Sequence, residues 1–269
     1  MPELPEVRTV ASVLKKELIN KKITDVKIIY SKIISKDSLD INLLINKTLK
    51  DITTIGKYLL FHFDKYILIS HLRMEGKYFI KEINENLNKH EHIIFIFNNK
   101  LSVRYHDTRK FGRMQLILKE DLNQNKSISK LAPEPFNLNE NDFYKKINKS
   151  IIPIKALLLD QTIINGLGNI YANEVLYDAK INPLKPGNKI TKKEASKIIE
   201  SSIKILNNAI IEKGTTIKSY TSSLGVTGNY QKHLKVHLKE NELCLECNNP
   251  IIKEKVRGRS TYYCKICQK

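Results

Sequence analysis

Four cysteines near one end of the sequence place the strongest constraint on how this chain can fold. They occur as Cys244-x2-Cys247 and Cys264-x2-Cys267, with 16 residues between the pairs. Two such pairs can present four thiolates from two tight turns to one tetrahedral ion, the pattern of an all-cysteine zinc site on a β-hairpin. Disulfides are the alternative, which a cytoplasmic chain disfavours. We therefore predict one structural zinc ion, with iron as the other candidate metal.

The segment between the cysteine pairs contains VRGRSTYY (256–263). A hairpin this short buries too little surface to fold alone, so metal binding would supply its folding energy. Arg257 and Arg259 would then project from a rigid tip. Guanidinium groups bind phosphates and base edges in a bidentate manner, so the tip is either a DNA contact or a pair of solvated charges.

The rest of the chain contains a helical residue pattern, then a β-rich one, then a helical one again. Apolar residues spaced by three and four predict a helix over residues 5–18. Short β-rich runs separated by polar turns then predict an antiparallel sandwich or barrel over about 23–119, with strands at 58–63, 66–72, 77–83, 92–97 and 113–118. Beyond a proline-containing linker (131–139), an apolar helical face starts with Ile154, Leu157 and Leu158 and is interrupted by the turn GLGN (166–169). Helical patterns follow at 170–179 and 191–213, and together they predict a helix-turn-helix-like core.

Charge narrows the choice of partner. The chain has 46 Lys and Arg against 28 Asp and Glu, a formal net charge of +18, which favours a polyanion such as nucleic acid. The alternative is compositional drift toward Lys, Asn and Ile, as in an AT-rich genome. No apolar run reaches the roughly 20 residues of a spanning helix, and the charged start does not fit a signal peptide. We expect a cytoplasmic monomer that contacts no membrane.

The first residues, MPELPEV, offer a nucleophile. If Met1 is removed, Pro2 carries a free secondary amine, and an α-amino group has a pKa of about 7.7 to 8.0 against about 10.4 for lysine. Such an amine could attack the C1′ atom of a nucleoside, expel the base and leave an iminium ion that enables strand cleavage. Glu3 lies next to it for proton transfer, and Glu6 follows one turn later. Both carboxylates could instead simply stabilise the start of a helix.

Seven segments in this order resemble the formamidopyrimidine-DNA glycosylase family. They are PELPEV at the start, GKYLLF (56–61), SHLRMEGKY (70–78), YHDTRKFGRM (105–114), LAPEPF (131–136), LLLDQTIINGLGNIYANEVLY (157–177) and GRSTYYC (258–264). The resemblance implies a multidomain α+β fold: an N-terminal helix with an antiparallel β-sandwich, a helix-two-turns-helix domain and a C-terminal β-hairpin zinc finger. We predict domains at 1–131, 132–234 and 235–269.

The resemblance also implies a role for individual residues in a bifunctional DNA glycosylase and abasic-site lyase that acts on damaged double-stranded DNA by β,δ-elimination. Pro2 would be the Schiff-base nucleophile and Glu3 the acid/base catalyst, with Glu6 in support. Lys57 and Arg259 would bind DNA phosphates and also take part in catalysis. The expected DNA contacts are His71, Met74, Arg109, Phe111, Lys155, Asn169 and Arg259. Of these, Met74, Arg109 and Phe111 would fill the space that an everted base leaves; without the family, Met74 and Phe111 would be assigned to the core.

Enzymes of this superfamily remove either oxidised purines or oxidised pyrimidines. The Met74, Arg109 and Phe111 set and the loop 217–231 favour oxidised purines, with the loop, including Tyr220 and Ser222, over an everted 8-oxoguanine. An endonuclease VIII-like preference for oxidised pyrimidines is the alternative, as is a zinc-dependent DNA-binding protein without catalysis. One segment departs from the family: VHLKENELC (236–244) lacks the usual Gly-Arg step and following Gly, which puts a local turn and one phosphate contact in doubt.

Overall fold

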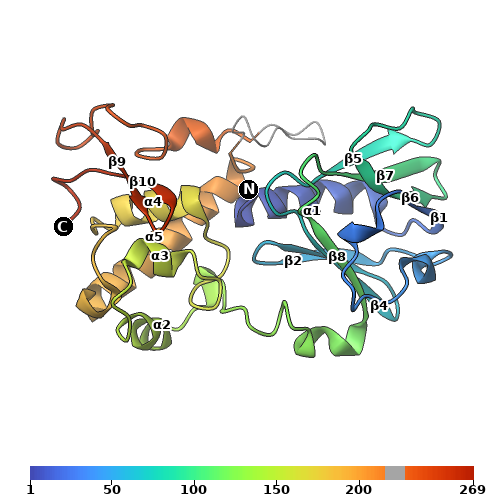
Figure 1. Ribbon diagram of the computed structural model, residues 1–269, viewed down its shortest axis with the longest axis horizontal. Helices are drawn as coiled ribbons and strands as arrows, with labels where there is room; N and C mark the ends of the chain where they lie inside the picture. Colours follow the sequence, from blue (N-terminus) through green and yellow to red (C-terminus); the bar gives the residue numbers. More distant parts are fainter. Residues whose placement is uncertain (216–227) are drawn as a thin grey trace. The chain divides into compact units, whose positions relative to one another are not determined.

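The computed structural model describes residues 1–215 and 228–269, which fall into two compact units (Figure 1). Unit 1 comprises the described residues within 1–129 and 213–229, and unit 2 comprises 130–212 and 230–269. Tyr220 and Ser222, which we expect near the lesion, lie outside the described residues. Across the described ranges, no helix is both long and apolar enough to cross a membrane.

In its described residues, unit 1 consists of one α-helix and two antiparallel sheets, as the sequence predicts. Its elements are α1 (Leu4–Leu18), β1 (Ile23–Ile28), β2 (Asp51–Ile55), β3 (Tyr58–His62), β4 (Tyr66–His71), β5 (Lys77–Glu82), β6 (Glu91–Phe97), β7 (Leu101–His106) and β8 (Arg113–Leu118), with short 3-10 helices at Ser31–Ile33, Ile41–Leu44 and Lys119–Gln124. One four-stranded sheet has the order β1-β6-β7-β5 and the other β2-β3-β4-β8. The β-sandwich prediction is confirmed.

A single apolar core joins the two sheets and α1 of unit 1. The helix buries the predicted stripe of Val7, Val10, Leu14 and Leu18. Alternation along the strands supplies further core residues, because successive side chains of a strand point to opposite faces. Tyr78 and Tyr105 lie in this core with their rings 5.4 Å apart at 63°, so two phenol groups are enclosed within the apolar layer. The loops described below extend from the strands of this core.

Unit 2 begins with helices. They are α2 (Glu140–Ile147), α3 (Ile154–Leu158), α4 (Asn169–Asp178) and α5 (Lys192–Ile211), with 3-10 helices at Pro135–Asn137, Gly187–Lys189 and Tyr230–His233. Helix α4 is buried on nearly all sides, and α5 packs against it. The turn before α4 contains Gly166 at φ 96°, a conformation that favours glycine. Helix α2 is absent from the sequence prediction, which extended the polar linker up to its first residue.

The C-terminal tail forms the predicted hairpin, in which β9 (Ile252–Val256) pairs with β10 (Arg259–Tyr263). Strand β10 packs on α4, so the tail belongs to the same compact unit as the helices. Its own core is small and includes Val236, Ile251 and Tyr262 together with Cys244 and Cys264. The division at residues 131/132 and 234/235 stays a prediction.

Candidate active site, DNA-contact loops and metal centre

The start of α1 buries the residues of the predicted catalytic end. Pro2 is buried, and Glu3 and Glu6 are 2% and 4% exposed. The backbone N–H of Glu3 donates to Oε2 of Glu6 over 2.9 Å, and the two residues form a capping box around the helix start. Both carboxylates thus satisfy the helix terminus, and their proposed catalytic role would come in addition to this.

The amino group of the chain lies in the same environment. Burial lowers the pKa of the Met1 amine below its ordinary value, while the charges of Glu3 and Glu6 oppose this shift and the charge of Lys57 adds to it. Lys57 is 5% exposed and lies in the turn between β2 and β3, directly after Gly56 at φ 54°. The side chains of Glu3, Glu6 and Lys57 are therefore buried, and their charges act on the chain amine.

Glu6 also ties the start of the chain to a segment 209 positions away. Its Oε1 accepts hydrogen bonds from the backbone N–H of Thr215 (2.7 Å) and from the Thr215 hydroxyl (3.1 Å). Gly214 fits here because a Cβ at that position would lie 2.6 Å from the same oxygen, and its φ of 78° is left-handed. Sequence reasoning missed Gly214 and Thr215, whose only signal is a Gly-Thr step after a long helix.

Two loops of unit 1 carry the residues expected to fill the DNA stack. Met74 lies on the segment 71–76, which starts at the last residue of β4 and is called the loop 71–76, and Arg109 and Phe111 lie on the loop 107–112. Phe111 is 48% exposed, and the Arg109 guanidinium lies 4.6 Å from the centre of its ring. An exposed phenylalanine under a cation does not belong to the core, so its exposure agrees with a role at an interface.

The loop 107–112 is held by one buried carboxylate. Asp107 is 0% exposed, and it accepts hydrogen bonds from the backbone N–H groups of Arg109 (3.0 Å) and Gly112 (2.8 Å). Its own backbone N–H donates to the carbonyl of His90 (3.0 Å), and its carbonyl accepts from Nε2 of His92 (2.7 Å). The position of the loop is therefore fixed at every polar group of Asp107.

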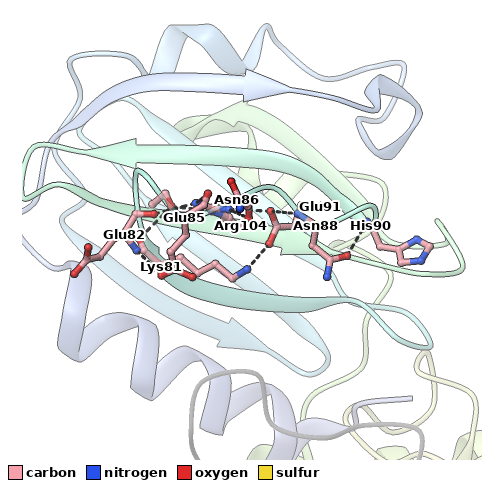
Figure 2. Close-up of polar contacts among 9 residues, drawn as sticks. Lys81, Glu82, Glu85, Asn86, Asn88, His90, Glu91 and Arg104 are labelled. Atoms are coloured by element: carbon pink, nitrogen blue, oxygen red, sulfur yellow. Dashed lines mark hydrogen bonds and ion pairs between the residues drawn. The ribbon is translucent and has the colours of Figure 1, made fainter.

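A buried arginine cluster supports the segment that ends at His90 (Figure 2). Arg104 is 1% exposed and uses its guanidinium against several acceptors: Ser102 Oγ, Glu91 Oε2 and the carbonyls of Glu82, Glu85 and Asn86, at 2.9 to 3.1 Å. Lys81 contacts the other carboxylate oxygen of Glu91 at 3.0 Å. Burial alone would raise the pKa of Glu91, but its hydrogen bonds and these cations lower it, so the cluster stays charged.

His71 is a neutral residue in this structure. It is 9% exposed, and its Nδ1 accepts a hydrogen bond from the backbone N–H of Arg73 (2.9 Å). Burial lowers its pKa to about 3, and the charges of Arg73 and Lys57 add to the shift. His71 therefore offers DNA at most a neutral Nε2–H, and its observed role is to hold Arg73 at a left-handed φ of 55° before Met74.

The four cysteines meet at one point. All four sulfur atoms lie within 4.8 Å of one another, and the Cys244–Cys267 and Cys247–Cys264 pairs are 3.8 and 3.4 Å apart. These distances exclude disulfides, which require about 2.05 Å, and they match the roughly 3.8 Å edge of a tetrahedron built on metal–sulfur bonds of about 2.3 Å. Burial would raise the pKa of Cys244, but hydrogen bonds from Tyr177 and backbone N–H groups lower it to about 6. The site suits a metal that binds thiolates.

Comparison with known proteins matches both units. The family model of the formamidopyrimidine-DNA glycosylase N-terminal domain matches residues 1–114, and the model of the H2TH domain of the same enzymes matches residues 131–221. A formamidopyrimidine-DNA glycosylase of Ligilactobacillus salivarius is 45% identical over 100% of this chain and 99% of its own, and one of Mycoplasma genitalium is 42% identical over 100% and 96%. The chain belongs to the formamidopyrimidine-DNA glycosylase family.

Solved structures of the family agree with the fold. The complex of Lactococcus lactis Fpg with DNA that contains an abasic site has a TM-score of 0.94 at 39% identity, and both chains are covered completely. A complex of a mutant of the same enzyme with DNA that contains Fapy-dG has a TM-score of 0.93 at 39% identity, again with complete coverage. The α+β fold class predicted from the resemblance is confirmed.

Within this family fold, unit 2 places its predicted contact residues in different surroundings. Arg259 and Arg257 are exposed at the hairpin turn, as predicted. Asn169 begins α4 and donates from Nδ2 to the carbonyl of Ser260 (3.0 Å), which links the helix to the hairpin; its Oδ1 is buried and has no partner among the described residues. Such an amide can still accept a hydrogen bond from a ligand or water.

Lys155 is fully buried. Its Nζ donates to Oδ1 of Asn173 and to the hydroxyl of Thr261 (3.4 Å), and Nδ2 of Asn173 in turn lies 2.7 Å from Nδ1 of His237. The amine thus connects α3, α4 and the hairpin, a role that the sequence does not reveal. A DNA contact by Lys155 stays a prediction.

The segment that departs from the family pattern has its own anchor. Glu174 on α4 is 3% exposed and accepts hydrogen bonds from the backbone N–H groups of Lys235, Val236 and His237 at 2.8 to 3.0 Å. The chain then turns with Leu238 at φ 64° and Asn241 at φ 68°. A turn is thus formed without the glycines that the family usually has there.

Proposed function

We propose that this protein is a bifunctional DNA glycosylase and abasic-site lyase of base-excision repair that removes oxidised purines such as 8-oxoguanine and formamidopyrimidines. The observation that carries this proposal is the buried start of α1, where the chain amine shares one environment with Glu3, Glu6 and Lys57 in a chain of this family. The DNA bound in complexes of its structural relatives contains an abasic site or Fapy-dG, which supports the same reaction class.

The nucleophile in this proposal is the amine of Pro2 after removal of Met1. Pro2 is buried at the start of α1, and burial favours the unprotonated form of an amine, as it does for the Met1 amine, whose pKa it lowers. Attack on C1′ expels the base and forms an iminium ion. Glu3 transfers protons during base loss and elimination, and Glu6 holds the backbone of Glu3 in place.

The partner in this proposal is damaged double-stranded DNA. Lys57, Asn169 and Arg259 would bind phosphates around the lesion, and Lys57 and Arg259 would also serve the elimination steps. Met74, Arg109 and Phe111 would replace the everted base in the stack, with the Arg109 guanidinium toward the orphaned cytosine. Phosphate contacts make binding fall with salt concentration. We propose that the enzyme acts in the cytoplasm of a bacterial-type cell, on the DNA of the nucleoid.

The ion at the four cysteines is zinc in this proposal. Four thiolates at tetrahedral spacing leave no open ligand position, so the ion would hold the hairpin and take no part in the reaction. It would fix Arg257 and Arg259 at the tip, where an otherwise short hairpin has little core of its own.

The test uses protein whose N-terminal processing is confirmed by mass spectrometry. We expect it to cleave duplex DNA with 8-oxoguanine opposite cytosine faster than duplex DNA with thymine glycol, and to form a covalent complex when borohydride is present. A Glu3→Gln variant purified in the same way controls for a host enzyme, and it should be slower by about 100-fold or more. Intact strands without an adduct would refute catalysis, whereas faster cleavage at thymine glycol would assign the enzyme to oxidised pyrimidines.

A further inference from the structure

The loops that carry Met74 and Arg109 both contact one buried group, the hydroxyl of Tyr105. Tyr105 is 0% exposed, and its hydroxyl donates to Oδ2 of Asp107 over 3.3 Å. The same carboxylate oxygen accepts the backbone N–H of Gly112. The hydroxyl is therefore part of the hydrogen-bond system that shapes the loop 107–112.

The hydroxyl also contacts the loop 71–76. A Cβ atom built on Gly76 would lie 2.3 Å from the Tyr105 oxygen, and one built on Gly112 would lie 1.6 Å from it. Neither glycine is described at a left-handed φ, so the need for glycine here comes from space and not from backbone conformation. The Tyr105 oxygen thus occupies the space that a Cβ atom at Gly76 or at Gly112 would need.

A second contact joins the loops closer to their tips. The hydroxyl of Thr108 donates to a carboxylate oxygen of Glu75, the residue after Met74. This pair is exposed, so water can replace it at little cost. The buried contact through Tyr105 is protected from such exchange, because its hydroxyl has no access to solvent.

We propose that Tyr105 is a positioning residue that keeps the loops 71–76 and 107–112 in register, so that Met74, Arg109 and Phe111 enter the DNA stack together when a base is everted. The inference rests on the proposed function. Without the hydroxyl, Asp107 loses one donor and a gap opens between Gly76 and Gly112. The loops can then shift independently, and small displacements of groups that must act together slow a reaction strongly.

The chain contains a matched control for this residue. Tyr78 is also 0% exposed, lies against Tyr105 and donates its hydroxyl to Ser70 Oγ over 2.8 Å. Ser70 lies in β4, outside both loops. Tyr105→Phe and Tyr78→Phe each remove one buried hydroxyl from the same core, so a loss that is merely structural should affect both variants alike.

Single-turnover rates on two substrates test the proposal. We expect Tyr105→Phe to slow excision of 8-oxoguanine opposite cytosine about 10-fold and to leave cleavage at a preformed abasic site within about twofold of wild type, because the abasic nucleotide has no base to evert. Tyr78→Phe should stay within about twofold on both substrates. The fluorescence of a 2-aminopurine next to the orphaned cytosine should show weaker insertion of Met74, Arg109 and Phe111 into the stack. This change should occur with Tyr105→Phe and not with Tyr78→Phe.

Three outcomes would overturn the proposal: no effect of Tyr105→Phe on excision, equal slowing on both substrates, or equal slowing of excision by Tyr78→Phe. Thermal unfolding of both variants shows whether they lose comparable stability, so that the rates compare like with like. Failure of the proposed function is separate, because it would appear as wild-type protein that cleaves neither substrate.

Discussion

The contact loops of unit 1 and the cysteine tail of unit 2 are held in different ways. The loops 71–76 and 107–112 rest on a two-sheet core, and buried polar groups such as Asp107 fix their backbones. The tail has a small core in which two of the four clustered cysteines take part, and Glu174 and Lys155 attach it to the helices. Loss of a single buried polar group should therefore shift the loops only slightly, whereas loss of a single cysteine should unfold the tail.

The largest effect should come from the tail. Cys264→Ser removes one of four thiolates, and because metal binding supplies the folding energy of so short a hairpin, we expect loss of the zinc and at least about 100-fold weaker DNA binding. Zinc content and binding titrations measure this. Unit 1 should keep its own unfolding transition, since its core contains no part of the tail.

Ile266→Ser is the matched control for the cysteine variant. Ile266 lies between Cys264 and Cys267, is 54% exposed and offers no metal ligand. It should bind zinc and DNA as wild type does. Unchanged zinc content and unchanged DNA binding in Cys264→Ser would show that the tail does not depend on this thiolate, and the contrast between the two regions would disappear.

A smaller effect should distinguish the loops. The pKa of His71 is about 3 in the folded protein and about 6.5 when unfolded, so the unfolded state binds the extra proton first. The stability that neutral His71 provides is complete above about pH 6.5 and is lost as the pH falls toward 3. Between pH 7 and 5.5 this should cost about 1 kcal/mol of the free energy of unfolding of unit 1.

Denaturant unfolding at the two pH values measures this loss. His71→Gln should reduce the pH dependence by that amount, because the variant has no imidazole to protonate. Equal pH dependence in His71→Gln and wild type would mean that His71 does not hold its loop as a neutral acceptor.

The sequence reveals those features that depend on local pattern. Helix α1 follows from its apolar spacing, and the cluster of four cysteines follows from their spacing, because in each case neighbouring residues carry the whole signal. Helix α2 was missed because its short sequence, ENDFYKKI, is mostly polar and gains stability from packing Phe143 and Ile147 into unit 2. Local propensity cannot show such tertiary stabilisation.

The parts of the site that the sequence does not reveal depend on contacts between distant residues. Glu6 meets Thr215 across 209 positions, and Lys155 reaches Thr261 across 106. A lysine in a basic chain suggests a surface charge, yet this one is buried because Asn173 and Thr261 satisfy its amine. Only the folded arrangement distinguishes these cases, although the family resemblance indicates which segments to inspect.

The most direct test of the catalytic account is to locate the trapped bond. Protein treated with borohydride on 8-oxoguanine duplex is digested, and the peptide that carries the sugar remnant is sequenced by mass spectrometry. We predict a peptide that begins at Pro2 with the modification on its amine. A remnant on Lys57 or another lysine, or a chain that reacts equally well with Met1 retained, would contradict it.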